Sequence, residues 1–237
     1  MTLFDHFLIF LLFVVQPVVG WINFRRYVKK IRAGEPVDRP RLYLETQIVQ
    51  WVFLVVLAGG WIYLARPTSD LGFVLPQGPG FLMMAFLVLA IGIALARSTR
   101  GVSQLDQSER ERHRSSFGDL GHFLPQCDRD LAGFYRLSVT AGIVEEIVFR
   151  GFVLWYLTLV MPMWAAILVS SFAFGLGHSY QGAGGMLRTG LAGVAFGVLF
   201  VISGSIWLPI VAHAMLDWLQ GRQIREIYRD AHGAATA

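Results

Sequence analysis

The sequence is poor in charge and in cysteine, and it lacks the short motifs of the commonest hydrolases. Only 15% of its 237 residues are charged, whereas 55% are hydrophobic. This balance excludes a soluble domain and predicts a polytopic, all-α transmembrane bundle. A single cysteine, Cys127, excludes an internal disulfide and a thiolate metal site. Neither Gly-x-Ser-x-Gly nor His-Glu-x-x-His occurs, so no serine nucleophile elbow and no zinc-protease helix is indicated.

Lysine is also scarce, since Lys29 and Lys30 are the only two among twenty basic residues and the rest are arginines. A pI near 9.5 would suit a nucleic-acid partner. The basic residues flank apolar runs, however, which is typical of membrane orientation. We therefore predict the lipid bilayer, and no nucleic acid, as the partner of this charge.

Seven apolar segments alternate with polar or glycine-rich connections. The first has no basic leader and no small-residue cleavage site, which favours a retained span over a signal peptide. Residues 97–130 form one extended polar connection with no convincing apolar stripe of helical period, and residues 179–185 are expected to form a glycine-rich turn. In the sixth segment Gly193 and Gly197 permit close helix contact. The predicted spans are 3–22, 47–65, 81–96, 131–160, 163–178, 186–202 and 205–219.

Seven spans would place nearly all basic residues on one side of the membrane. The exceptions are Arg66 and the intramembrane Arg150, with Arg136 near a boundary. The positive-inside rule then predicts an outside N-terminus and a cytoplasmic C-terminus, as in a multi-pass protein of a bacterial inner membrane. The expected organisation is an N-terminal helical region over 1–130, a core of four helices over 131–220 and a cytoplasmic tail over 221–237.

Three ionisable residues interrupt the apolar run 141–154: Glu145, Glu146 and Arg150. Each such group costs at least ~2.5 kcal/mol at bilayer depth, so the three must face a protein interior. Glu146 and Arg150 are four apart and can pair on one helix face. Glu145 points about 100° away from Glu146 and has no partner on its own helix. The cluster is either a buried ion pair with a spare acid or part of a reactive site.

Two further helices carry matching polar groups, His178 on one and His213 with Asp217 on the other. At 1.5 Å per residue, Glu145 and His178 both lie roughly 22 Å from the outer boundary and Asp217 roughly 18 Å. Alone, His178 could be a solvated helix end, and His213 with Asp217 a structural hydrogen bond. Together with Glu145 they predict a polar, functional cavity that opens toward the cytoplasm.

The chemistry of this set leaves two alternatives open. A carboxylate beside a neutral imidazole can deprotonate water for attack on a carbonyl, while a second imidazole stabilises the oxyanion. Glu145, His178, His213 and Asp217 could also bind a divalent metal such as zinc, because imidazole and carboxylate are suitable ligands. The sequence alone does not choose between metal-free and metal-dependent hydrolysis.

Three motifs in this order, Glu145-Glu146-x-x-x-Arg150, Phe174-x-x-x-His178 and His213-x-x-x-Asp217, resemble the CPBP family over residues 131–219. This is the group of CAAX-processing and bacteriocin-processing intramembrane endopeptidases that includes the Rce1-type enzymes. The resemblance implies an intramembrane protease that cleaves a membrane protein or peptide, lipidated or not.

The resemblance also implies roles for single residues. It assigns Glu145 and His178 to water activation and His213 to the oxyanion, with Glu146 and Arg150 positioning the catalytic pair. Rce1-type members commonly carry asparagine at the position of Asp217, so the role of Asp217 stays open. The alternative functions are a proton- or ion-coupled carrier and a non-catalytic binding or immunity protein on the same fold.

Overall fold

The computed structural model describes residues 1–229, which form helices and no strand. Two of the long rods are composite, because a π-helical turn joins their α-helical parts. The first rod comprises α1 (Leu3–Phe10), η1 (Leu11–Val15) and α2 (Gln16–Arg32), and the second comprises α6 (Asp128–Glu146), η4 (Ile147–Val153) and α7 (Leu154–Thr158). The other long helices are α3 (Arg39–Tyr63), α4 (Gly78–Ser103), α8 (Met163–Gly177), α9 (Gly182–Ser203) and α10 (Trp207–Tyr228). Short helical segments are η2 (Thr68–Leu71), α5 (Gln107–Ser116), η3 (Gly118–Phe123) and η5 (Ser179–Gln181).

The protein is a multi-pass integral membrane protein. Within residues 1–229, four helices are long and apolar enough to cross a membrane: Leu3–Arg32, Arg39–Tyr63, Gly78–Ser103 and Ser179–Ser203. Helix α8 is apolar but shorter, with 15 residues. Each of the seven predicted spans coincides with a helix, so the all-α bundle is confirmed. The count of seven membrane crossings is not confirmed.

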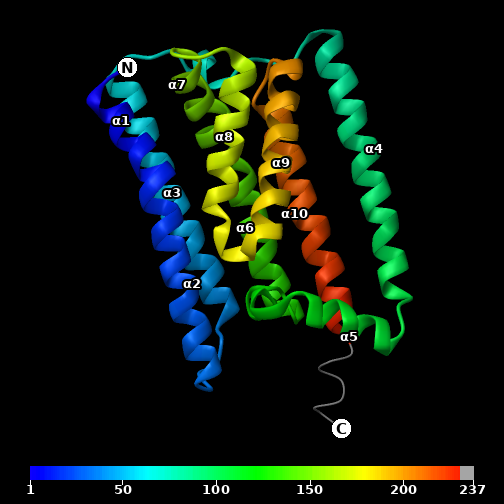
Figure 1. Cartoon of the computed structure of the whole chain (residues 1–237). Coiled ribbons are helices and arrows are strands. Elements are labelled where there is room, and N and C mark those ends of the chain that lie inside the picture. The colour runs from blue at the N-terminus through cyan, green and yellow to red at the C-terminus, as the bar shows by residue number, and fades with distance from the viewer. Residues whose placement is uncertain (230–237) are drawn as a thin grey trace.

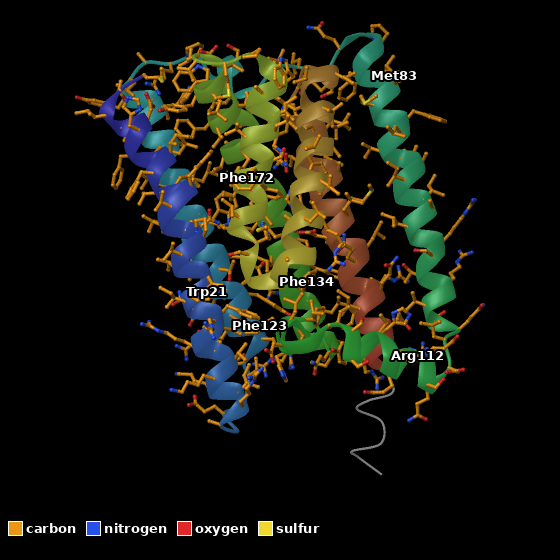
Figure 2. The ribbon with its side chains drawn as sticks, viewed as in Figure 1. Trp21, Met83, Arg112, Phe123, Phe134 and Phe172 are labelled. Carbon is orange, nitrogen blue, oxygen red and sulfur yellow. The ribbon has the colours of Figure 1, made fainter. Side chains whose placement is uncertain are left out.

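The bundle has α6 at its centre, with α10 and α3 packed against it (Figure 1). Helix α8 packs against α9, and α4 packs against α10 at the edge of the bundle. The N-terminus lies at one end of the bundle. The last turns of α2, the helix α5 and the last turns of α10 lie at the other end, where many arginines gather, Arg112 of α5 among them (Figure 2). We call this the basic end; its assignment to the cytoplasm stays a prediction.

Glycine lets the central helices approach closely. A Cβ on Gly142 of α6 would lie 2.9 Å from the carbonyl oxygen of Ile210 and 2.8 Å from the Cβ of Ala214, both on α10. Between α8 and α9, a Cβ on Gly193 would lie 3.0 Å from the Cβ of Ser171. The close contact predicted for the sixth span is therefore confirmed at Gly193.

A buried ion pair ties the first helix to the bundle at the end opposite the basic end. Both Nη atoms of Arg66 donate to the carboxylate oxygens of Asp5, at 2.7 and 2.8 Å. The guanidinium lies over the rings of Trp61 and Trp155, 5.1 and 4.6 Å from their centroids. Because Trp155 belongs to α7 and Trp61 to α3, this single cation joins α1, α3 and α7.

Within residues 97–130 the structure corrects the sequence interpretation, because α4 continues to Ser103 and α5 is a helix. Asp106 caps α5: the backbone N–H of Glu109 and the hydroxyl of Ser108 donate to its carboxylate and hold its pKa below the usual value. Arg110 and Arg114 then donate to the carbonyls of Glu226 and Ile227 near the end of α10. Basic side chains, rather than an apolar stripe, hold this helix in place.

Two smaller boundaries also differ from prediction. The expected turn over 179–185 is shorter, because α9 begins at Gly182, whose φ of +78° lets the chain reverse direction before the helix starts. Helix α10 runs to Tyr228 and so includes the first part of the predicted tail. The remainder of that tail, residues 230–237, lies outside the described residues.

Candidate active site

Glu145 lies on α6 and faces the centre of the bundle, where 18% of its side chain is exposed. Its Oε1 accepts a 2.8 Å hydrogen bond from Nε2 of Gln50 on α3. Its Oε2 lies 4.0 Å from Nε2 of His213 on α10, and His178 lies within electrostatic reach. As expected, Glu145 has no partner on its own helix and instead contacts groups from neighbouring helices.

Glu146, fully buried, is the centre of a three-residue chain. Its Oε1 accepts from Nη1 of Arg150 at 2.9 Å and from Nδ1 of His213 at 2.7 Å. Arg150 also donates to the carbonyl of Gly193 on α9, at 3.2 Å. The predicted pairing of Glu146 with Arg150 is present, and it extends across the bundle to an imidazole.

This chain fixes the orientation of His213. An ionised carboxylate only accepts, so Nδ1 of His213 is the donor to Glu146. The other ring nitrogen, Nε2, faces Oε2 of Glu145 at 4.0 Å and Oδ2 of Asp217 at 3.6 Å. Both separations are ion-pair contacts that are longer than a hydrogen bond, so Nε2 can still donate to another acceptor. Asp217 is the more solvated acid, with 34% of its side chain exposed.

Two phenylalanine rings enclose the charged groups. Phe196 stacks on the imidazole of His213, with centroids 5.0 Å apart and planes at 13°. The guanidinium of Arg150 lies 4.6 Å from the ring centroid of Phe174 and 5.3 Å from that of Phe196. Aromatic faces attract cations, so these rings stabilise positive charge inside an otherwise apolar bundle.

His178 follows the last residue of α8 and is partly exposed. Its Nδ1 lies 2.8 Å from the carbonyl oxygen of Phe174. A carbonyl only accepts, so Nδ1 carries a proton and Nε2 of the neutral ring is an acceptor. The ring of Phe174 contacts both imidazoles, with its centroid 4.8 Å from that of His178 and 6.1 Å from that of His213.

The backbone of the central helix changes directly after the two acids. Residues Ile147–Val153 form a π-helical turn that contains Arg150 and lies within one continuous rod. Such turns insert an extra residue and often occur at functional sites. One turn before the acids, the contact of Gly142 with α10 brings the two backbones close enough for Glu146 to reach His213.

The candidate metal ligands were Glu145, His178, His213 and Asp217. Among residues 1–229, no group of three or more histidine, cysteine, aspartate or glutamate side chains is placed to hold a metal ion. Glu146 and the carbonyl of Phe174 engage only Nδ1 of His213 and of His178, which leaves Nε2 of each ring available. The four residues are not gathered around one point in the structure, so no step below is routed through a metal.

The structure brings five predicted residues together by direct contacts: Glu145, Glu146, Arg150, His213 and Asp217. His178 joins them through the ring of Phe174. The resemblance implied that Glu146 and Arg150 position Glu145 and His178. In the structure, Glu146 instead makes its direct contact across the bundle with His213. Sequence reasoning missed Gln50, although an amide inside an otherwise apolar span was a readable signal.

Comparison with known proteins adds one finding to this geometry. Residues 128–219 match the family described as Type II CAAX prenyl endopeptidase Rce1-like. No curated protein and no solved structure matches the chain. The matched region contains both acids of α6, both imidazoles and Asp217, so it covers the whole site except Gln50. Over residues 128–219, which hold nearly the whole site, the chain is therefore similar to the Rce1-like family of CAAX-type endopeptidases.

Proposed function

We propose that this protein is an intramembrane endopeptidase that hydrolyses a peptide bond of a membrane-associated protein or peptide with water activated by Glu145 and His178. The observation that carries this proposal is that the two imidazoles near Glu145 are held by different hydrogen bonds. His178 is held with Nε2 as an acceptor, and His213 is held by Glu146 with Nε2 turned toward Glu145. One ring can therefore receive a proton while the other supports developing charge.

In the first step, the water oxygen bonds to the carbonyl carbon of the scissile amide while Glu145 takes a proton, assisted by Nε2 of His178. Protonated His213 then donates from Nε2 to the oxyanion. Three carboxylates lie around the ring and Phe196 stacks on its face, and all four groups attract positive charge. In the second step, the carbon–nitrogen bond breaks and the proton held by Glu145 passes to the leaving amine.

The other contacts of the site support this assignment. Gln50 donates to Glu145 and so leaves one carboxylate oxygen to meet water. Oε1 of Gln50 and Oε2 of Glu146 are buried acceptors with no donor among the described residues, and a water molecule could donate to either. Arg150 balances the charge of Glu146 without contacting the reacting atoms.

The test compares membranes that contain the wild-type chain with membranes that contain Glu145→Gln or His178→Ala, using terminus-specific proteomics. We expect a truncated membrane protein or peptide with the wild-type chain alone. Glu111→Gln, which alters an exposed acid of α5, is the matched control and should retain the product. If Glu145→Gln yields the same products as the wild-type chain, the proposal is refuted.

The same proteins in liposomes separate this function from the carrier alternative. A carrier would give pH-dependent ion flux without a peptide product, and Glu145→Gln would abolish that flux. A protease gives the product without coupled flux.

A further inference from the structure

A basic cleft lies beside the candidate active site, toward the basic end of the bundle. It has a volume of about 740 Å³ and is bounded by α2, by η3 and by the η5 turn with the start of α9. Trp21 on α2 and Phe123 on η3, both labelled in Figure 2, mark this part of the molecule. The α2 cleft, as we call it, is lined by residues that include Trp21, Phe24, Arg25, Arg26, Lys29 and Tyr180.

The charge in the α2 cleft is strongly one-sided. Arg25, Arg26, Lys29 and Arg32 all line it, whereas Asp119 is the one acid on its wall. Asp119 is already paired with Arg32 at 2.8 Å. Among the described residues, the other three cations have no carboxylate within ion-pair distance, and Arg25 lies over the ring of Trp21 at 4.8 Å. Apolar walls focus such a field, so the cleft attracts an anionic group.

The α2 cleft borders the candidate active site through one side chain, Tyr180. Tyr180 lines the cleft, and its ring centroid lies 5.9 Å from that of His178. On its other side, Tyr180 contacts Phe24 of α2 at 5.7 Å. A peptide that reached Glu145 from the basic end would therefore place its neighbouring residues against Tyr180 and the α2 cations.

We propose that the α2 cleft binds a carboxylate-bearing stretch of the substrate peptide next to the bond that is hydrolysed. This inference rests on the proposed function and specifies the substrate class. The carboxylate belongs to an acidic side chain or to the chain terminus, since arginine binds either in the same bidentate way. We favour the peptide over a phospholipid headgroup because the cleft shares Tyr180 with the candidate active site, where the ring of Tyr180 lies 5.9 Å from that of His178.

The test measures binding rather than cleavage, with the full chain carrying Glu145→Gln in nanodiscs of neutral phosphatidylcholine. The probes are fluorescent peptides with one shared apolar core. One pair has an aspartate-rich or an asparagine-rich flank, and a second pair lacks acids and ends in a free carboxylate or an amide. We expect the acidic member of at least one pair to bind about tenfold more tightly, which is less than one buried charge-assisted hydrogen bond would give, because water and salt screen charges in an open cleft.

The variant Arg25→Gln/Arg26→Gln should remove that preference. Arg97→Gln/Arg100→Gln is the matched control, because these exposed arginines lie near the end of α4, away from the cleft. It should keep the preference, and thermal unfolding should be unchanged in both. Equal binding of acidic and neutral probes overturns the inference, as does the same loss in both double variants.

A lipid occupant would give a different result. Added phosphatidylglycerol would then bind in a manner sensitive to Arg25→Gln/Arg26→Gln, while the peptide probes showed no preference, and the inference would be wrong. The experiments also distinguish a failure of this inference from a failure of the proposed function. A charge preference without any hydrolysis by the wild-type chain would refute the protease and leave the anion site, whereas hydrolysis without the preference would do the reverse.

Discussion

Replacing Gln50 by leucine would remove the hydrogen bond that reaches Glu145 from outside the family-matched region. The amide of Gln50 donates to Oε1 of Glu145 at 2.8 Å, and the carboxylate is mostly buried. A hydrogen bond to a charged group contributes about 1.5–3 kcal/mol. If that contribution holds Glu145 in its reactive orientation, kcat should fall roughly 10- to 100-fold, because each 1.4 kcal/mol is about a factor of ten.

The loss should appear in kcat rather than in KM, because Gln50 positions the acid and does not bind the substrate. The free energy of unfolding should fall by no more than about 1–3 kcal/mol, because Oε1 of Glu145 loses its donor but the carboxylate stays partly solvated. Leucine has a similar volume, and the substitution also removes a buried amide oxygen that has no donor among the described residues. The assay is the rate of product formation from the substrate found by proteomics, together with thermal unfolding in the same detergent.

Gln47→Leu provides the matched control, one helical turn earlier on α3. The amide of Gln47 donates to the backbone carbonyl of Tyr43 at 3.0 Å. It is partly buried like Gln50. We expect its kcat to stay within about twofold of the wild-type value, since no contact to the acids is lost. The positioning role of Gln50 is refuted if both variants lose the same activity, or if Gln50→Leu alters KM alone.

Four other predictions follow from the same contacts. Glu146→Gln should lower the free energy of unfolding by about 3–5 kcal/mol, because it leaves Arg150 buried without its counter-charge; unchanged thermal unfolding would contradict this. Asp5→Asn should lower the Tm as well, through the loss of the bidentate pair with Arg66, while the folded fraction keeps its kcat. Asp217→Asn should retain activity within about tenfold, since the acid is partly exposed and not hydrogen-bonded to His213; a far larger loss would give it a chemical role. Elemental analysis of the active protein should find less than one equivalent of divalent metal, and chelation should leave the rate unchanged; stoichiometric zinc would show that the four candidate ligands rearrange around it.

The contacts that lie within one helix could be predicted from the sequence. Glu146 and Arg150 are four residues apart, so helix geometry alone places them on one face, and the 2.9 Å hydrogen bond confirms it. The contacts between helices could not be derived in this way. Spacing along the chain does not say that Glu146 meets His213 rather than His178, because that depends on how far α10 slides along α6. The approach at Gly142 fixes this register.

The features missed were those without a periodic signal. The mostly apolar sequence Ile147–Val153 is equally compatible with an α-helix, so it gave no signal for the π-helical turn after Glu146. Helix α5 was missed because its buried side is made by Arg110 rather than by apolar residues. Its capping pair, Asp106 and Glu109, was nevertheless present in the sequence and would have marked its start.

The shortness of α8 links this protein to the thickness of its lipid environment. With 15 residues, α8 is roughly 22 Å long, whereas the hydrocarbon layer is about 30 Å thick. The turn that carries His178 consequently ends near mid-height in the bundle, well short of the basic end (Figure 1). In a thin bilayer that turn stays hydrated, and in a thick one the acyl chains close over it. The thickness of the bilayer would therefore set how much water reaches the turn that carries His178.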